Sequence, residues 1–155
     1  MLCKSKKINI YNKAIELIDF GEKKFDVITL WHVIEHLENP LKTIRKACKI
    51  LSDNGILVFQ VPNNGSLGFK CGKKYWFHLD SPRHLMIPNI KTINYLCTKN
   101  GLKIIRVINE FYDYPLDLFW SVRKSPIRFI VYPFYPIFKL LSKEHSTFIC
   151  RKANL

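Results

Sequence analysis

Several side chains that can carry charge or transfer protons stand close together in the middle of the chain. Four of them fall within seven positions and follow the aromatic pair Trp76 and Phe77: His78, Asp80, Arg83 and His84. Aromatic rings beside histidine and arginine are typical of a substrate pocket. The alternative is a hydrogen-bonded loop that closes over the fold, with Asp80 and Arg83 as a local ion pair.

A second cluster has the spacing of a zinc peptidase motif. Residues 32–36 read His-Val-Ile-Glu-His, a pattern in which two histidines bind metal and the glutamate activates water. Glu110 lies far downstream as a possible third ligand. However, the cluster directly follows an apolar strand pattern, and the surroundings of a large peptidase domain are absent. We therefore expect no metal site, and we expect Glu35 and His36 to brace the turn before Asn39.

The composition predicts one globular domain with a basic surface. The chain has 155 residues, of which 48% are apolar, which is enough for a single core. Lys and Arg exceed Asp and Glu by 25 to 12, a net charge of +13 that favours anionic partners. Five widely spaced cysteines without a Cys-x-x-Cys pair fit a reducing, cytoplasmic setting. The most apolar stretch, residues 127–141, is shorter than the roughly 20 residues that span a bilayer.

The elements that must position these side chains alternate between strand and helix. Apolar, β-branched runs predict strands at residues 25–31, 56–61, 103–109 and 147–150, with a weaker one at 8–11. Asn39 with Pro40, and later Asn89, have the sequence pattern of helix N-caps. This order predicts an α/β fold with a mainly parallel sheet, in which ligands bind outside the carboxyl ends of the strands. The site is then expected near residues 31–32 and 62–64, under the loop 65–88.

Three segments resemble class I S-adenosylmethionine-dependent methyltransferases. Residues 25–37, followed by Asn39 and Pro40, resemble the fourth strand of that family and the turn after it. Residues 50–58 are similar to the passage into the fifth strand, and residues 76–85 resemble a bacterial branch with type 11 or type 23-like domains. The resemblance implies a Rossmann-like, mostly parallel sheet whose last strand is antiparallel. It divides a single domain into a core at 8–109, an aromatic-rich helical insert at 111–142 and a final strand at 145–151.

The resemblance also implies a reaction and a set of site residues. An oxygen, nitrogen or carbon nucleophile of an unidentified acceptor would attack the methyl group of S-adenosylmethionine. The predicted cofactor-binding residues are Leu30, Trp31, His32 and Asn12. The predicted catalytic residues are His78 and His84, and Asn63, Asp80 and Arg83 are predicted to bind the substrate.

Other features of the chain leave alternatives open. The family begins with a strand and a glycine-rich cofactor loop, whereas the first glycine here is Gly21, so we expect an N-terminally incomplete domain that starts just before the third strand. It would then be a methyltransferase, or a non-catalytic remnant or subunit whose cofactor site a partner chain or a dimer completes. A basic module that binds a lipid or nucleic-acid surface is the further alternative, with nucleic acid less favoured.

The segment 111–138 adds a possible membrane contact to these alternatives. It holds ten of the 21 aromatic side chains and is flanked by basic residues. Such a composition is typical of peripheral contact with a membrane or of a lipid-like substrate, and equally of a cover over the sheet.

Overall fold

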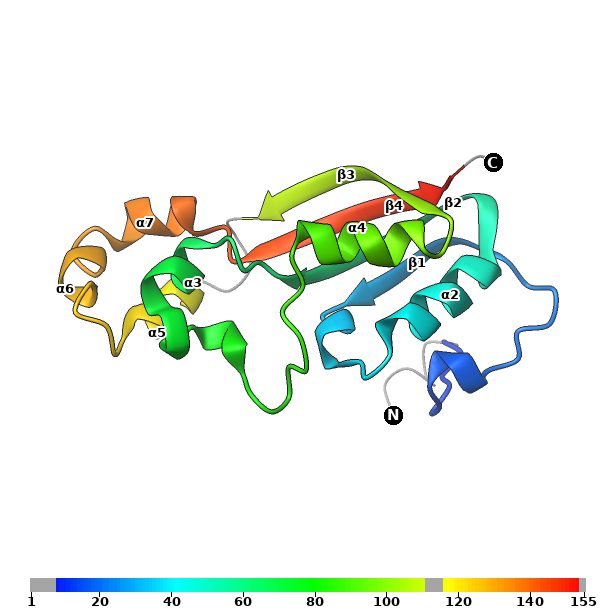
Figure 1. Cartoon of the computed structure of the whole chain (residues 1–155), viewed down its shortest axis with the longest axis horizontal. Helices are drawn as coiled ribbons and strands as arrows, with labels where there is room; N and C mark the ends of the chain where they lie inside the picture. Colours follow the sequence, from blue (N-terminus) through cyan, green and yellow to red (C-terminus); the bar gives the residue numbers. More distant parts are fainter. Residues whose placement is uncertain (1–7, 111–115, 154–155) are drawn as a thin grey trace.

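The chain folds around one mixed β-sheet of four strands (Figure 1). The computed structural model describes residues 8–110 and 116–153. Strands β1 (Phe25–Trp31), β2 (Leu51–Pro62), β3 (Leu102–Glu110) and β4 (His145–Lys152) have the spatial order β1-β2-β4-β3. β1 and β2 are parallel, whereas β4 is antiparallel to both of its neighbours, β2 and β3. The predicted mostly parallel sheet with an antiparallel last strand is confirmed, and that strand lies inside the sheet.

Two amphipathic helices cover one face of this sheet (Figure 1). α2 (Pro40–Ile50) begins after Asn39, whose side chain accepts a hydrogen bond from the Lys42 N–H at 3.1 Å. α4 (Ile90–Thr98) begins after Asn89, which accepts one from the Thr92 N–H at 2.9 Å. Both predicted caps are confirmed. The two helices and the strands share one core, whose buried members include Ile44, Ala47, Leu57, Phe59, Ile93, Leu96 and Phe148.

Two strand predictions differ from the structure. Residues 8–11 form no strand and lead into a single 3₁₀ turn at Ile15–Leu17. Tyr11 does not pair with β1, and its ring packs edge-on against the ring of Phe20. β2 begins at residue 51 and not at 56, because residues 52–55 bulge out of the ladder. Phe25 pairs with Leu51, and two positions later Val27 already pairs with Ile56.

β1 forms an edge of the sheet in the part of the chain that the structure describes. Its sequence is apolar on both faces, which predicts a strand that is buried on both sides, yet Val27 is 55% exposed and Trp31 is 53% exposed. Leu30 is the buried member of the strand. The open edge leaves the carboxyl end of β1 accessible.

Short helices gather beyond one end of the sheet and pack on one another (Figure 1). They are α3 (Leu67–Gly72), α5 (Asp117–Val122), α6 (Arg128–Val131) and α7 (Tyr135–Ser142), with 3₁₀ turns at Lys73–Tyr75 and Phe77–Leu79. Leu118, Val122 and Val131 form a second small core among them. A Cβ atom on Gly72 would lie 2.5 Å from the Ser121 carbonyl oxygen, so glycine allows the close approach of α3 to α5. The predicted aromatic insert is therefore helical where it is described.

Candidate active site

All five histidines of the chain line one cavity of about 630 Å³. His32 directly follows β1, His145 begins β4, and the other three come from residues 36–84. Because β4 runs antiparallel to its neighbours, its first residue lies at the same edge of the sheet as the last residues of β1 and β2. The remaining lining residues are Phe77, Asp80, Arg83, Leu116, Asp117 and Trp120.

A buried carboxylate joins two of these histidines. Asp117 Oδ2 lies 3.0 Å from His78 Nε2 and 3.0 Å from His145 Nε2. All three side chains are buried, and the two imidazole rings meet edge to face at 4.6 Å. Burial by itself raises the pKa of Asp117, but the hydrogen bonds from His145 and His78 outweigh it and hold that pKa below its usual value. An ionised carboxylate only accepts hydrogen bonds, so both Nε2 atoms donate to it.

His32 links the end of β1 to this group. It has a positive φ of 50°, and its backbone N–H donates to the Gln60 carbonyl at 3.2 Å. Its ring meets His145 edge to face at 4.9 Å, and its Nδ1 lies 3.1 Å from Glu35 Oε1. The unusual turn therefore directs the imidazole into the cavity, while the preceding indole of Trp31 stays exposed.

The loop that contains His78 and His84 is both hydrogen-bonded and part of the cavity wall. His84 Nδ1 donates to the His78 carbonyl at 2.6 Å. Asp80 and Arg83 form an ion pair at 2.6 Å, with the Arg83 side chain 75% exposed. The segment is thus a hydrogen-bonded loop with a local ion pair, and four of its polar side chains also line the cavity.

Glu144 fastens this loop to the rest of the fold. Its carboxylate accepts hydrogen bonds from Trp76 Nε1 at 2.8 Å, from Ser66 Oγ at 3.0 Å and from the Gly68 N–H at 2.8 Å. Burial raises the pKa of Glu144, and these hydrogen bonds oppose that rise only in part. The carboxylate therefore joins the start of β4 to α3 and to the aromatic end of the histidine loop.

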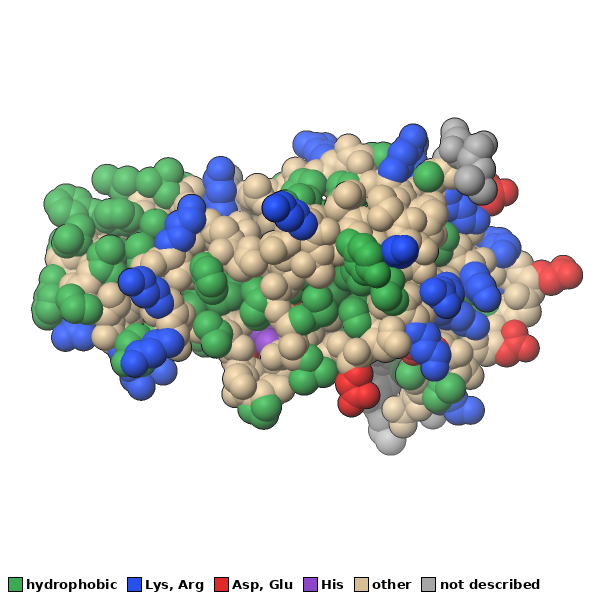
Figure 2. All heavy atoms as spheres, in the orientation of Figure 1, with side chains coloured by type: hydrophobic (Ala, Val, Ile, Leu, Met, Phe, Trp, Pro, Cys, Tyr) green, Lys and Arg blue, Asp and Glu red, His purple; other side chains and the backbone are tan. Residues whose placement is uncertain are grey.

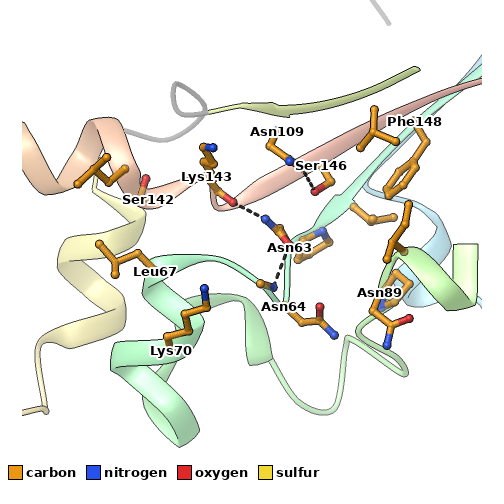
Figure 3. A pocket seen from close by; sticks show the side chains of 17 residues that line it. Asn63, Asn64, Leu67, Lys70, Asn89, Asn109, Ser142, Lys143, Ser146 and Phe148 are labelled. Atoms are coloured by element: carbon orange, nitrogen blue, oxygen red, sulfur yellow. Dashed lines mark hydrogen bonds between the residues drawn. The ribbon is translucent and has the colours of Figure 1, made fainter. Parts of the chain in front are cut away.

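Asn63 lies in a second cavity, of about 740 Å³ (Figure 3). Its amide donates to the Lys143 carbonyl at 2.8 Å and accepts from the Gly65 N–H at 2.9 Å, so the side chain stabilises the turn after β2. Other amides, those of Asn64, Asn89 and Asn109, also line this cavity. Its charged lining side chains are lysines, Lys70 and Lys143, whereas the histidine cavity combines the five histidines with Asp80, Asp117 and Arg83. We therefore take the histidine cavity as the candidate active site.

The predicted site residues thus fall in different places. His32, His78, Asp80, Arg83 and His84 come together in the histidine cavity. Leu30 is buried in the core, and the exposed Trp31 stands at the sheet edge. Asn12 lines a separate cleft formed by residues 10–19, which none of residues 30–32 reaches.

Sequence reasoning missed Asp117, Trp120 and His145. Asp117 begins a helix within the aromatic segment, and His145 lies before the apolar pattern at 147–150 and is included only in the strand 145–151 that the resemblance implies. The one available signal was the Glu-His pair at the start of the final strand, Glu144 and His145. In an antiparallel last strand, such a pair falls at the ligand-binding edge of the sheet.

The sheet order, the helical layer and the position of the cavity define a Rossmann-like α/β domain of the class I methyltransferase type. The chain belongs to the Methyltransferase domain family, whose model matches residues 4–107. No curated protein matches the sequence.

Solved structures share this fold at low sequence identity. A methyltransferase from Thermotoga maritima, described as a possible histamine N-methyltransferase, has a TM-score of 0.65 at 11% identity over 99% of this chain and 67% of its own. An O-methyltransferase from a Brevibacillus brevis multienzyme, in complex with S-adenosyl-L-homocysteine, has a TM-score of 0.60 at 14% identity over 98% and 53%. The cyclase SpnF has a TM-score of 0.62 at 12% identity over 98% and 60%. The chain therefore spans between 53% and 67% of the length of these proteins.

Proposed function

We propose that the chain takes part in methyl transfer from S-adenosylmethionine to a small acceptor that binds in the histidine cavity. The observation that carries this proposal is the hydrogen bond from His78 to the buried Asp117, beside a cavity of about 630 Å³ in a methyltransferase-family domain. Its volume suits a small molecule, since ligand pockets of roughly 300–1,000 Å³ are usual. The acceptor atom is an oxygen, nitrogen or carbon nucleophile.

His78 is the proposed general base. Because its Nε2 donates to Asp117, the lone pair of the neutral ring is on Nδ1, which takes the proton from the acceptor hydroxyl or amine. The low pKa of Asp117 keeps a negative charge beside the imidazolium that forms. The Nδ1 of His84 donates to a backbone carbonyl instead. We therefore place the base at His78 and return to His84 below.

The end of β1 fits one side of the cofactor. The Trp31 indole is exposed at the open edge, and an electron-rich aromatic face attracts a cation such as a sulfonium. Leu30 is buried, which leaves its backbone for contact, and His32 directs its ring toward the acceptor cavity. When bound, S-adenosylmethionine would supply the methyl group, with Trp31 on the cofactor side and His32 on the side of the acceptor cavity.

Calorimetric titration of the 155-residue chain with S-adenosylmethionine and S-adenosylhomocysteine tests the cofactor. We expect micromolar binding, which Trp31→Ala weakens and Trp31→Phe largely restores. Absence of binding to either compound would show that this chain alone does not hold the cofactor. Light scattering on the same sample would then show whether a second copy covers the open edge of β1.

Transfer of a labelled methyl group to phenol, alcohol and amine acceptors tests the base. His78→Gln should lower the rate by about 100-fold or more while cofactor binding stays unchanged. Lys91→Gln, on the exposed side of α4, is the matched control and should keep full activity. Equal rates for both variants would remove His78 from the mechanism.

We further propose that the helical insert rests on an anionic lipid surface. Six of its large apolar side chains are more than half exposed: Phe129, Ile130, Phe134, Ile137, Leu140 and Leu141. Residues 118–143 include five Lys or Arg and no Asp or Glu. Figure 2 shows the apolar side chains gathered at the end formed by α6 and α7, with basic side chains around them. Among the described residues, no helix is long and apolar enough to cross a membrane, so the proposed contact is peripheral.

A further inference from the structure

Three residues in or next to the histidine cavity take no part in the proposed proton transfer: Glu35, His36 and His84. Glu35 is fully buried, and one of its oxygens, Oε1, meets His32 Nδ1 at 3.1 Å. The other oxygen, Oε2, is buried and has no hydrogen-bond partner in the described part of the chain. A buried carboxylate oxygen is costly to leave unmatched, so this atom needs a cation or a donor.

The two histidines of this group are held in the orientation that metal ligands require. His36 Nδ1 lies 2.9 Å from the Arg83 carbonyl, and His84 Nδ1 lies 2.6 Å from the His78 carbonyl. A carbonyl can only accept, so each Nδ1 carries the hydrogen and each Nε2 keeps its lone pair. Metal-binding histidines typically donate their second nitrogen to a carbonyl or carboxylate in this way.

The positions of these three side chains suit one small cation. One ligating atom from each of the three residues lies within 4.8 Å of the other two. Ligand atoms around one such ion are about 3–4 Å apart, so small side-chain rotations bring the three onto a common centre. We propose that Glu35, His36 and His84 bind a divalent transition-metal ion of the zinc type, with its open positions toward the cavity. Two imidazoles and one carboxylate form the mixed nitrogen and oxygen donor set that such ions accept.

Residues 32–36 have the spacing of a zinc peptidase motif, but the proposed site uses these residues differently. Residues 34–36 form a 3₁₀ turn, so His32 and His36 do not lie one α-helical turn apart. His32 contacts Glu35 and His145 instead, and Glu35 becomes a ligand and not the base. Three protein ligands with an open position are typical of a Lewis-acid site, which would polarise an acceptor hydroxyl beside His78. Only this chemical role rests on the proposed methyl transfer; the binding of the ion does not.

A second cluster, His78, Asp117 and His145, is the competing location for an ion. Two hydrogen bonds of 3.0 Å already join its three ligating atoms. Among the described residues, neither carboxylate oxygen of Asp117 is a buried atom that lacks a hydrogen-bond partner. An ion there would have to break both bonds. The unmatched oxygen of Glu35 therefore favours the first group.

Cobalt(II) titration of the metal-stripped chain, followed by absorption, tests this proposal, with zinc in equilibrium dialysis as a second probe. We expect one equivalent to bind, and the double variant His36→Ala with His84→Ala, as well as Glu35→Gln, to lower the affinity at least tenfold. Asp117→Asn disrupts the competing group and should leave the affinity unchanged. Circular dichroism of each metal-free variant shows whether it is folded, and a rise in Tm on adding zinc should occur only where the ion binds.

Three outcomes would overturn the site. The first is no cobalt or zinc binding to the wild-type chain. The second is loss of binding in Asp117→Asn with none in the Glu35, His36 and His84 variants. The third is an intense thiolate-to-cobalt band, which would place the ion on cysteines such as Cys97 and Cys150, whose sulfur atoms lie 3.5 Å apart. These readouts need no S-adenosylmethionine, so failure of the metal site and failure of methyl transfer are distinguishable.

Discussion

At the scale of single residues, the cavity depends on a buried charge at Asp117. One carboxylate oxygen serves both His78 and His145, and it remains ionised because those two hydrogen bonds outweigh the effect of burial on its pKa. Hydrogen bonds to charged groups are worth about 1.5–3 kcal/mol each. The same atom therefore contributes to stability and fixes the ring orientation on which the proposed base depends.

Asp117→Asn should lower the free energy of unfolding by about 2 kcal/mol near neutral pH, because a neutral amide oxygen in place of Oδ2 accepts weaker hydrogen bonds from the two histidines than the carboxylate does. The pKa of Asp117 in the fold lies below its ordinary value of 3.8, so its contribution is present above that value and is lost as the pH falls through the lower one. Urea unfolding of the wild-type chain and of the variant should give a difference in unfolding free energy that becomes smaller in acid. A difference that stays constant down to low pH would contradict the assigned ionisation of Asp117.

At the scale of elements, the direction of β4 builds the site. An antiparallel strand between β2 and β3 brings Glu144 and His145 to the edge where the parallel strands end. Glu144 then joins α3 and the histidine loop to this edge through three hydrogen bonds. A Cβ atom on Gly68 would collide with that carboxylate, so this position of α3 requires glycine.

Trp76→Phe tests this connection by removing the indole donor to Glu144. The pKa of Glu144 is raised above 4.5, so its contribution to stability is complete below that value and declines as the pH rises through the folded pKa. The lost donor favoured the ionised form, so the variant should lose about 1–2 kcal/mol more near pH 7 than near pH 4. Urea unfolding at both pH values measures the difference. Trp31→Phe, at an exposed indole, is the control, and an equal loss at both pH values for Trp76→Phe would contradict this role.

At the scale of the whole molecule, exposed apolar side chains gather at the helical end, next to basic residues. The net charge is +13, and α6 and α7 expose large apolar side chains among basic residues. Apolar side chains that enter a bilayer interface gain about 1.5–3 kcal/mol each when fully buried, and lysine and arginine add attraction to anionic lipid.

Sedimentation with vesicles of phosphatidylglycerol and phosphatidylcholine tests the proposed membrane contact. The chain should bind at low salt and dissociate partly as salt is raised, because screening weakens the electrostatic share. The double variant Phe129→Ser with Ile137→Ser should bind at least tenfold more weakly. Leu17→Ser, which removes an equally exposed apolar side chain far from the insert, should bind like wild type. No binding of the wild-type chain at low salt would end this proposal.

The sequence by itself predicted most of the local elements and the edge of the sheet at which the candidate site lies. Asn39 and Asn89 cap their helices because an amide oxygen directly before a helix meets a free backbone N–H, which needs no distant partner. The apolar runs at β1, β2, β3 and β4 are long enough to predict strands for the same local reason. Helix and strand periodicity, however, holds no information on which strands are neighbours in space.

Only the tertiary structure decided which residues share the cavity. His32, His78, Asp117 and His145 are far apart in sequence, and they meet because β4 enters the sheet antiparallel and α5 packs on α3. The same packing separates Asn63 and Asn12 from them, although their positions after predicted strands suggested one common site. The exposure of β1 was likewise undetermined, because an apolar strand has the same sequence pattern at an edge as in the middle of a sheet. Contacts between distant segments, and not local preference, place the chemistry of this protein.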